Sequence, residues 1–305
     1  MSALTDNDLL TTLSGRLEQL AETAGNAVVG VRSQGCHVAS GFAWRPGTVV
    51  TAASAVEPDE ELSVSPAADR NLAAQLAGRD LATGIAVLRV REGLPEAPPF
   101  AASSQERVGR LVLALGRGDP GLVAALGMIS TVSGPWQSQR GGSLDRLIVL
   151  DMQLREPCKG GIVIDGDGAL LGMALLGPRQ RPLVIPTATI ERVAPRLLAD
   201  GRIERGYLGV GLHPIRLDDA LAAVHALQDR RASMVVSVDP DGPARKGGIL
   251  VGDVIVGFNG EPVAGVRSLL GKLTPESVGR VAELRLLRAG QIATAKVAIG
   301  ARPAA

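Results

Sequence analysis

The sequence predicts a mainly β protein, in which two small β-barrels precede a shorter unit of mixed helices and strands. Short apolar runs recur in two groups of about six, and most are bounded by Gly, Pro, Asp or Ser. The 38 glycines and 19 prolines interrupt the chain too often for long helices to dominate. Hydrophobic residues make up 46% and aromatic residues only 2%, so the cores must consist mainly of Val, Leu, Ile and Ala. Two groups of about six strands favour two barrels.

The first segment is predicted to be an amphipathic helix over residues 7–24. Five leucines recur at helical spacing within it: Leu9, Leu10, Leu13, Leu17 and Leu20. Such a stripe fits equally well a contact with another copy of the chain or packing on the chain's own barrel.

Twelve short β runs follow the helix. The first group is AVVGV, ASGFAWR, GTVVTAA, ELSVS, LAAQLAGR and GIAVLRV, and the second is RLVLALG, GMISTVSG, RLIVLDM, GGIVIDGDG, LLGMALLG and PLVIP. The segment TATIERVAPRLLADG then predicts a helix, with Thr189 as its N-cap and Gly201 at its C-terminal stop.

A new unit is predicted to begin near residue 204. LDDALAAVHAL and GVRSLLGKL are predicted helices, and RVAELRLLRAGQIATAKVAI predicts a hairpin whose turn holds Ala289 and Gly290. In DPDGP, Pro243 can start a helical turn. The expected organisation is therefore a helical segment over 1–25, a double barrel over 26–203 and an α+β unit over 204–305.

Charge and composition exclude several classes of partner. The formal net charge of +1 gives no electrostatic reason to expect nucleic acid, and no apolar run reaches the length of a membrane span. The N-terminal stretch carries Asp6 and Asp8 where a secretory signal has basic residues, so the expected compartment is the cytoplasm rather than the periplasm. Cys36 and Cys158 match no metal-site spacing. We expect no metal, no cofactor and no disulfide in a reducing cytosol.

Several stretches resemble the HtrA family of trypsin-like proteases with one C-terminal PDZ domain. They are ASGFAWRPGTVVTAASAV, GRDLATGIAVLRV, PCKGG, VIPTATIERVAPRLLADGRIERGYLGV and DPDGPARKGGILVGDVIVGFNGEPV, and the resemblance runs from about residue 17 to 299. It implies a trypsin-like double β-barrel followed by a PDZ domain. It also implies a possible homo-oligomer, since the family forms trimers, although the aromatic residues that serve that contact are missing from this N-terminal segment.

The sequence departs from the family at each catalytic position. The family's histidine falls on Ser54, its aspartate on Gly84 and its serine on Lys159, while Asp80 lies four residues before the aspartate position. The oxyanion hole uses backbone N–H groups at the serine position and two residues before it. The earlier of these falls on Pro157, which has no N–H to donate.

Other side chains offer few replacements for the triad. His213 and His225 belong to the last unit. The neighbours Cys36 and His37 point to opposite faces of a strand, so we expect ordinary packing or surface placement for these two residues. Ser54 and Lys159 would face each other, and such a pair can catalyse acyl transfer if the lysine is desolvated. We favour instead a lysine that fills an inactive site. Cys158 has no base placed for it.

The PDZ-like unit supplies the predicted binding site. The resemblance places a carboxylate-binding loop at Tyr207, Leu208, Gly209 and Val210, with a ligand-pairing strand that continues to Leu212. The other wall is predicted to be a helix whose candidate liners are Val266, Leu269, Leu270 and Leu273. Any single one of these leucines is as consistent with the core as with the groove.

Three functions follow from this combination. The main expectation is an inactive HtrA-like pseudoprotease that acts as a peptide- or protein-binding scaffold, a chaperone-like factor or a regulator by binding C-termini in its PDZ groove. The alternative is an active serine-type endopeptidase with Ser54/Lys159 chemistry. The third is a structural assembly protein, which light scattering would test.

Overall fold

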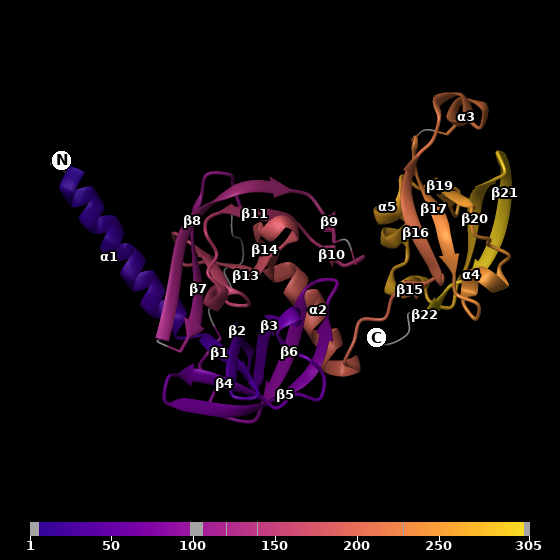
Figure 1. Ribbon diagram of the computed structural model, residues 1–305. Coiled ribbons are helices and arrows are strands. Elements are labelled where there is room, and N and C mark those ends of the chain that lie inside the picture. The colour runs from indigo at the N-terminus through magenta and orange to yellow at the C-terminus, as the bar shows by residue number, and fades with distance from the viewer. Residues whose placement is uncertain (1–5, 98–105, 120, 139, 228, 302–305) are drawn as a thin grey trace. The chain divides into compact units, whose positions relative to one another are not determined.

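The computed structural model of the protein describes residues 6–97, 106–119, 121–138, 140–227 and 229–301, and of residues 6 and 7 only the backbone. The chain forms two compact units (Figure 1). The first contains residues 1–136 and 143–203, and the second contains residues 137–142 and 204–305.

The first group of strands closes into a barrel in the order β1-β2-β3-β6-β5-β4. Its strands are β1 (Val28–Ser33), β2 (Cys36–Arg45), β3 (Thr48–Ala52), β4 (Leu62–Ala67), β5 (Arg70–Asp80) and β6 (Ile85–Val90). Gln34 and Gly35 join β1 to β2 with φ angles of 49° and 78°, which matches the two-residue turn that suits the twist of a hairpin.

The second group closes into a second barrel in the order β11-β14-β13-β12-β7-β8, which confirms the prediction of two barrels. Its strands are β7 (Leu111–Gly118), β8 (Gly121–Ser133), β11 (Leu147–Asp151), β12 (Ile162–Asp165), β13 (Leu170–Leu176) and β14 (Pro182–Pro186). The short strands β9 (Trp136–Gln137) and β10 (Ser143–Leu144) form a separate pair.

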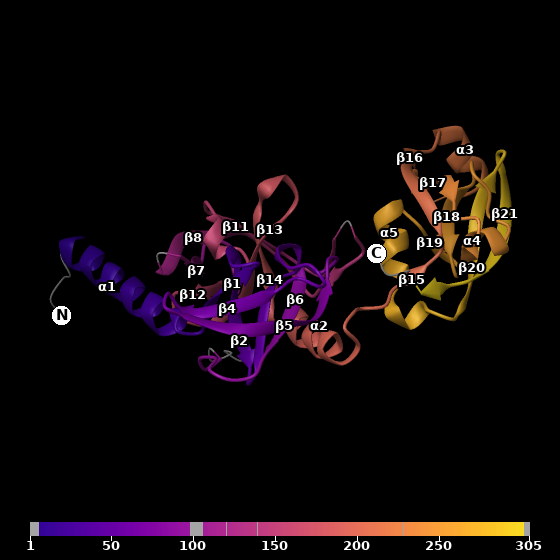
Figure 2. The same ribbon diagram turned by 60° about the horizontal axis from the view of Figure 1, so that its bottom comes forward.

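Two helices flank the barrels. The helix α1 (Asp6–Gly25) confirms the predicted N-terminal helix, and it extends away from the barrels in both views (Figures 1 and 2). Near its C-terminal end Leu20 is buried in the core, whereas Leu9, Leu10 and Leu13 are exposed. The leucine stripe therefore packs on the chain's own barrel only near the C-terminal end of the helix.

The helix α2 (Thr187–Asp200) ends as predicted and begins differently. Gly201 has a φ of 72° and its N–H donates to Leu197 O, so it is the C-terminal stop. The N-cap, however, is Pro186, and the prediction of Thr189 was wrong. Thr189 lies inside the helix because its hydroxyl is engaged elsewhere, donating to Asp145 Oδ2 at 2.8 Å and accepting from Asp145 N at 3.0 Å.

One hydrophobic core joins the two barrels. Phe42, Val50 and Ile85 from the first barrel meet Leu115 and Ile162 from the second, and α2 packs on the same cluster. Each barrel also has a smaller core of its own. The junction between the barrels is therefore fixed by apolar packing.

The second unit is a sheet with the strand order β16-β17-β18-β20-β21, in which β19 pairs with β18. The strands of this sheet are β16 (Val210–Arg216), β17 (Arg231–Val238), β18 (Val254–Phe258), β19 (Glu261–Pro262), β20 (Val281–Arg288) and β21 (Gln291–Ala298). The short strands β15 (Gly206–Tyr207) and β22 (Gly300–Ala301) form a separate antiparallel pair. The helices of the unit are α3 (Asp219–Val224), α4 (Pro243–Lys246) and α5 (Val266–Lys272).

Local signals in this unit agree with the structure, apart from one helix length. The hairpin β20–β21 turns at Ala289 and Gly290, whose φ angles are 48° and 80°, and Pro243 is the first residue of α4. The helix predicted over 217–227 is shorter in the structure. Asp218 caps its start by accepting a hydrogen bond from Ala220 N at 2.9 Å, and the helix ends at Val224. None of the helices in the described part of the chain has the length and apolar character of a membrane span.

Candidate functional site

The structure brings the three predicted triad positions to one place between the barrels. Ala53 N donates to Gly84 O at 2.9 Å, which joins the turn η1 (Ala53–Ala55) to the start of β6. Ser40 N donates to Lys159 O at 2.8 Å. A Cβ atom added to Gly160 would lie 3.0 Å from Ala52 N. Positions 54, 84 and 159 therefore belong to three loops in direct backbone contact.

Ser54 and Lys159 do not form the hydrogen bond of a catalytic pair. The Ser54 side chain is exposed and Lys159 is half-buried. Neither side chain makes a hydrogen bond or an ion pair with another residue in the described ranges. The lysine is thus neither held against the serine nor neutralised by a nearby carboxylate.

Gly84 has a backbone and surroundings that disfavour an aspartate side chain. Its φ is 81°, in the left-handed region that glycine adopts without strain. A Cβ atom at this position would lie 2.6 Å from Leu175 Cδ2 of β13. The space that an orienting carboxylate needs is therefore filled by a leucine.

The nearest carboxylate in the sequence, Asp80, is already engaged within its own turn. It is buried, and its oxygens accept from Thr83 Oγ1 at 2.7 Å, Thr83 N at 3.2 Å and Ala82 N at 3.2 Å. These bonds hold the turn that leads into Gly84, whose N–H donates to Asp80 O at 2.8 Å. Asp80 is thus a turn residue.

The two N–H groups of the expected oxyanion hole are both lost in this conformation. Pro157 has no N–H, and the Lys159 N–H donates to Glu156 O at 3.0 Å within the turn η2 (Glu156–Cys158). The next N–H, that of Gly160, donates to Ala174 O at 2.8 Å. Neither of the two expected positions, nor Gly160, therefore has an N–H group left for a developing oxyanion.

A polar network that the sequence analysis missed holds this turn in place. Ser40 is fully buried, and its hydroxyl donates to Pro157 O and accepts from Arg117 N at 2.7 Å. Arg117 in turn donates to Val28 O at 2.7 Å, and His37 Nε2 lies 2.7 Å from Arg117 O. Ser40 and Pro157 are 117 residues apart in the sequence and belong to different barrels, so the pairing of the barrels brings them together.

Cys158 is unsuited to act as a nucleophile. Its side chain is fully buried, and burial raises the pKa of the Cys158 thiol to about 11, against a smaller opposing effect of Arg155. The thiolate is the reactive form of cysteine, and it is scarce at such a pKa. Cys36, by contrast, is exposed.

The loop at Leu208 and Gly209 in the second unit has engaged carbonyl groups and unengaged N–H groups. Leu208 O accepts from Ala244 N at 2.7 Å and Gly209 O accepts from Asp239 N at 2.8 Å, so both carbonyl groups are tied inward. The N–H groups of Leu208 and Gly209 donate to no other group among the described residues. The φ of 75° at Gly209 permits this path.

The strand that follows this loop is open along one side. β16 stands at the end of the sheet and pairs with β17 alone among the described strands. Val210 and Leu212 are half-buried against the core of the unit. Tyr207 closes the start of the loop, since its hydroxyl donates to Asp239 Oδ2 at 3.1 Å.

The predicted groove residues in and directly after helix α5 form two groups, which differ in burial. Leu269 and Leu273 are buried core residues, which is the alternative that the sequence left open for any one of them. Val266 and Leu270 are half-buried and keep surface for a ligand.

Within the described ranges, no three His, Cys, Asp or Glu side chains come close enough to hold a metal ion.

Comparisons with known proteins agree with this architecture. The trypsin-like peptidase domain model matches residues 39–173, and the PDZ domain model matches residues 206–299. A probable periplasmic serine endoprotease DegP-like of Brucella suis biovar 1 is 31% identical over 275 residues, which cover 84% of this chain and 51% of that protein. The protein with the same name from Pseudomonas fulva is 30% identical over 274 residues, covering 85% of this chain and 55% of that protein. The chain thus spans about half the length of these relatives.

Solved structures share the fold over nearly the whole chain. A serine endoprotease from Yersinia pestis superposes with a TM-score of 0.73 at 27% identity, covering 94% of this chain and 98% of that one. The HtrA-type protease AlgW with a decapeptide superposes with a TM-score of 0.74 at 23% identity, covering 94% and 99%. The similarity to AlgW, at 23% identity, is evidence for the fold alone.

The comparisons overturn the expected compartment. The relatives are named periplasmic endoproteases, so the expectation of a cytoplasmic protein was wrong. That expectation rested on the composition of the first residues, which is a weaker indicator than similarity over most of the chain. The fold, the two matching models and the order of the units lead to one conclusion: the chain consists of a trypsin-like serine protease domain of the HtrA/DegP type followed by one PDZ domain.

Proposed function

We propose that this protein binds peptide C-termini in the groove between β16 and α5 and does not cleave them by the Ser–His–Asp mechanism. The observation that carries the binding part is the pair of unengaged N–H groups at Leu208 and Gly209, beside the open edge of β16. A peptide carboxylate accepts hydrogen bonds from such groups, and the peptide backbone then extends the sheet along Val210–Leu212.

The groove favours an apolar C-terminal residue. Val266 and Leu270 offer half-buried apolar surface from α5, opposite Val210 and Leu212. Burying an aliphatic side chain against such a wall contributes roughly 1.5–3 kcal/mol. The contacts to the ligand's backbone and carboxylate are independent of sequence, so the terminal side chain sets the preference.

The protease domain supports the non-catalytic part of the proposal. Removing a single oxyanion donor lowers the rate of other serine proteases by about two to three orders of magnitude. Here Pro157 lacks the donor, Lys159 uses its own N–H within the turn, and Leu175 fills the place of an aspartate at Gly84. The domain then serves as a scaffold, a chaperone-like factor or a regulator in the compartment of its relatives, the periplasm.

The exposed half of α1 supports self-association. Leu9, Leu10 and Leu13 are between 42% and 68% exposed on a helix that leaves the barrel. Covering them against a second copy removes apolar surface from water. Light scattering on the full chain measures the mass of the assembly directly, and a monomer at micromolar concentration contradicts this part.

A serine endopeptidase is the second candidate, and the names of the relatives favour it. It would require Ser54 as nucleophile and Lys159 as base, because no triad member is in place. The two side chains come from loops in backbone contact, which is the structural argument for it.

Two assays separate the candidates. Hydrolysis of unfolded casein by the native chain is compared with the Lys159→Ala/Ser54→Ala double variant, and we expect no turnover by either. Turnover that disappears in the double variant refutes the inactive reading and supports the endopeptidase.

Peptide binding is measured by fluorescence polarisation, with peptides that end in Val, Leu, Ile or Phe. Each peptide has a C-terminally amidated control, which keeps the side chains and removes the charged carboxylate. We expect the amide to bind about 10- to 100-fold more weakly, since hydrogen bonds to a charged group contribute roughly 1.5–3 kcal/mol. Equal binding of acid and amide contradicts the role of Leu208 and Gly209.

A further inference from the structure

The open edge of β16 presents backbone groups to a ligand at every second residue. Leu217 N donates to Arg230 O at 2.7 Å, one step beyond the last pair of the β16–β17 ladder. In an antiparallel pair, residues bonded to the partner strand alternate with residues whose N–H and C=O groups point to the other side. The register of the ladder does not shift between Leu212 and Arg216. The residues of this range that face the open edge are therefore Leu212, Pro214 and Arg216.

The start of the strand continues the same alternation. Gly209 O accepts from Asp239 N at 2.8 Å and is thus turned toward β17, so Val210 faces the open edge. A ligand whose carboxylate binds at the loop before β16 places its terminal residue beside Val210. The ligand then runs antiparallel to β16. The residue two positions before its terminus lies beside Leu212, and the residue four positions before its terminus lies beside Pro214.

Pro214 interrupts this series of backbone donors. Leu212 can donate its N–H to the ligand and accept a hydrogen bond in return, which completes one pair of ladder bonds. Pro214 has no N–H, and its ring carbon Cδ takes the place of the hydrogen on the side from which the ligand approaches. The Pro214 side chain is exposed at this edge. The ligand carbonyl four positions before the terminus therefore faces water and the proline ring, and finds no donor on β16.

The length of α5 on the other side of the groove gives the same limit. The helix contains 7 residues, Val266–Lys272, and is therefore about 10 Å long at about 1.5 Å per residue. An extended chain advances about 3.4 Å per residue, so this wall flanks about three residues of a ligand. The half-buried groove residues Val266 and Leu270 both lie within it. The strand and the helix thus agree on a short ligand.

We propose that this groove binds a C-terminal tail of about three residues, and that Pro214 excludes a longer paired strand. The inference rests on the proposed binding of C-termini and defines the ligand, a protein whose last residues are extended and free, whatever structure precedes them. An interior β-strand brings no terminal carboxylate and depends on a longer ladder of hydrogen bonds, so it binds poorly here. Pro214 thus also protects the sheet edge from pairing with other strands.

The first test compares two peptides on the full native chain. An N-acetylated tripeptide and an N-acetylated hexapeptide share the last residues Val-Ala-Leu, and the longer peptide is extended upstream by alanines. Competition fluorescence polarisation measures both affinities. We expect them to agree within about 2-fold, since a further net hydrogen bond contributes more than this. A hexapeptide that binds more tightly than this overturns the inference and leaves the proposed groove in place. If neither peptide binds, the proposed function fails and this inference fails with it.

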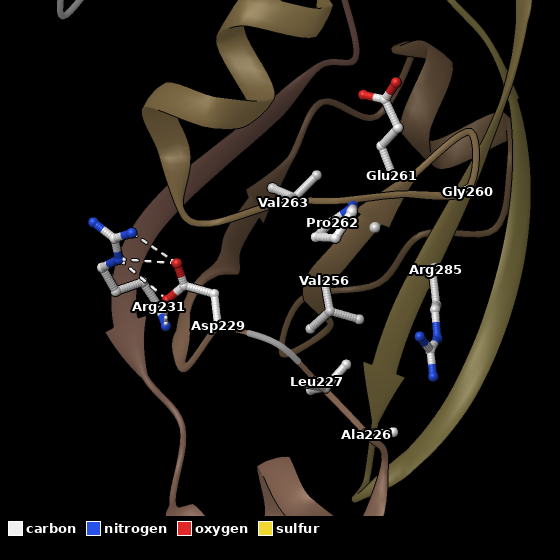
Figure 3. A pocket seen from close by; sticks show the side chains of 11 residues that line it. Ala226, Leu227, Asp229, Arg231, Val256, Gly260, Glu261, Pro262, Val263 and Arg285 are labelled. Atoms are coloured by element: carbon white, nitrogen blue, oxygen red, sulfur yellow. Dashed lines mark hydrogen bonds and ion pairs between the residues drawn. The ribbon is translucent and has the colours of Figure 1, made fainter.

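The Pro214→Ala variant restores the missing donor. We expect it to bind the hexapeptide about 2- to 12-fold more tightly than the native chain does, and the tripeptide equally well. Pro262→Ala is the matched control, because it removes an exposed proline from β19, which pairs with β18. Figure 3 shows Pro262 beside Val256 of β18, in a surface pocket that both residues line. An equal gain in the control, or no gain in Pro214→Ala, overturns the proposal.

A backbone ester in the hexapeptide tests the same ligand atom without a variant. The ester replaces the amide whose carbonyl belongs to the residue four positions before the terminus, and an ester carbonyl is the weaker acceptor. We expect ester and amide to bind the native chain equally, and the ester to lose the gain in a Pro214→Ala variant whose thermal midpoint matches that of the native chain. Weaker binding of the ester by the native chain means that this carbonyl is bonded, which overturns the proposal. This comparison decides the question even where Pro214→Ala does not fold.

Discussion

Restoring an aspartate at position 84 should destabilise this protein and not recreate a catalytic orienter. A side chain at a φ of 81° is in the left-handed region, which costs roughly 1–2 kcal/mol. The new Cβ would also lie 2.6 Å from Leu175 Cδ2, and overpacking of this kind costs roughly 1–3 kcal/mol. The Gly84→Asp variant should therefore lose roughly 2–5 kcal/mol of unfolding free energy.

A double-mutant cycle separates the two contributions. Gly84→Ala introduces the backbone strain and the clash without a carboxylate, and Gly84→Asn adds the shape of aspartate without its charge. In the Leu175→Ala background the clash disappears, so Gly84→Ala should cost about 1 kcal/mol less there than in the native chain. Urea unfolding is followed by tryptophan fluorescence, since Trp44 is buried in the core shared by both barrels and Trp136 packs against it.

Two results would refute this reasoning. One is a Gly84→Asp variant that is as stable as the native chain. The other is an equal cost of Gly84→Ala in the presence and absence of the Leu175 side chain, which would mean that Leu175 does not occupy the position.

Two further predictions concern titratable groups. Iodoacetamide at pH 8 should modify Cys36 and spare Cys158 in the folded chain, because a thiol with a pKa of about 11 is ionised in roughly one molecule in a thousand; mass spectrometry that finds equal labelling contradicts the burial. For Asp253, burial opposes ionisation, but hydrogen bonds from Arg288 and Leu250 N outweigh it and lower the pKa of this carboxyl. Its contribution to stability is thus complete above the unfolded pKa of about 3.9 and is lost as the pH falls through the lower folded value. Asp253→Asn should therefore destabilise the chain more at pH 7 than at pH 2 in urea unfolding, and an equal effect at both pH values refutes the pairing.

The regular elements could be predicted because their signals are local. Twelve apolar runs became the twelve barrel strands, and Ala289–Gly290 and Gly201 adopt the positive φ angles that their turns require. Thr189 misled because its hydroxyl is engaged with Asp145, a residue 44 positions away. Local capping rules do not include such a partner.

The state of the candidate site depends on contacts that no local pattern contains. The resemblance to the family led to the prediction that the triad positions fall on residues 54, 84 and 159, and Pro157 has no N–H. That the Lys159 N–H turns to Glu156 O, and that Leu175 fills the place beside Gly84, depends on how the second barrel meets the first. The same holds for the bond from Ser40 to Pro157 O.

The residues of the core shared by the barrels, which hold the fold of this domain together, are different from the residues at its candidate site. Phe42, Leu115 and Ile162 hold the junction together, whereas Ser54 is exposed and Lys159 contributes nothing to that cluster. Polar catalytic constellations ordinarily cost a protein stability, because they place charges and strained geometry where packing would be favoured. Exposed cleft residues such as Ser54 can therefore be exchanged while the domain still presents the same rigid platform, whereas Gly84, which lies against Leu175, cannot be exchanged as freely.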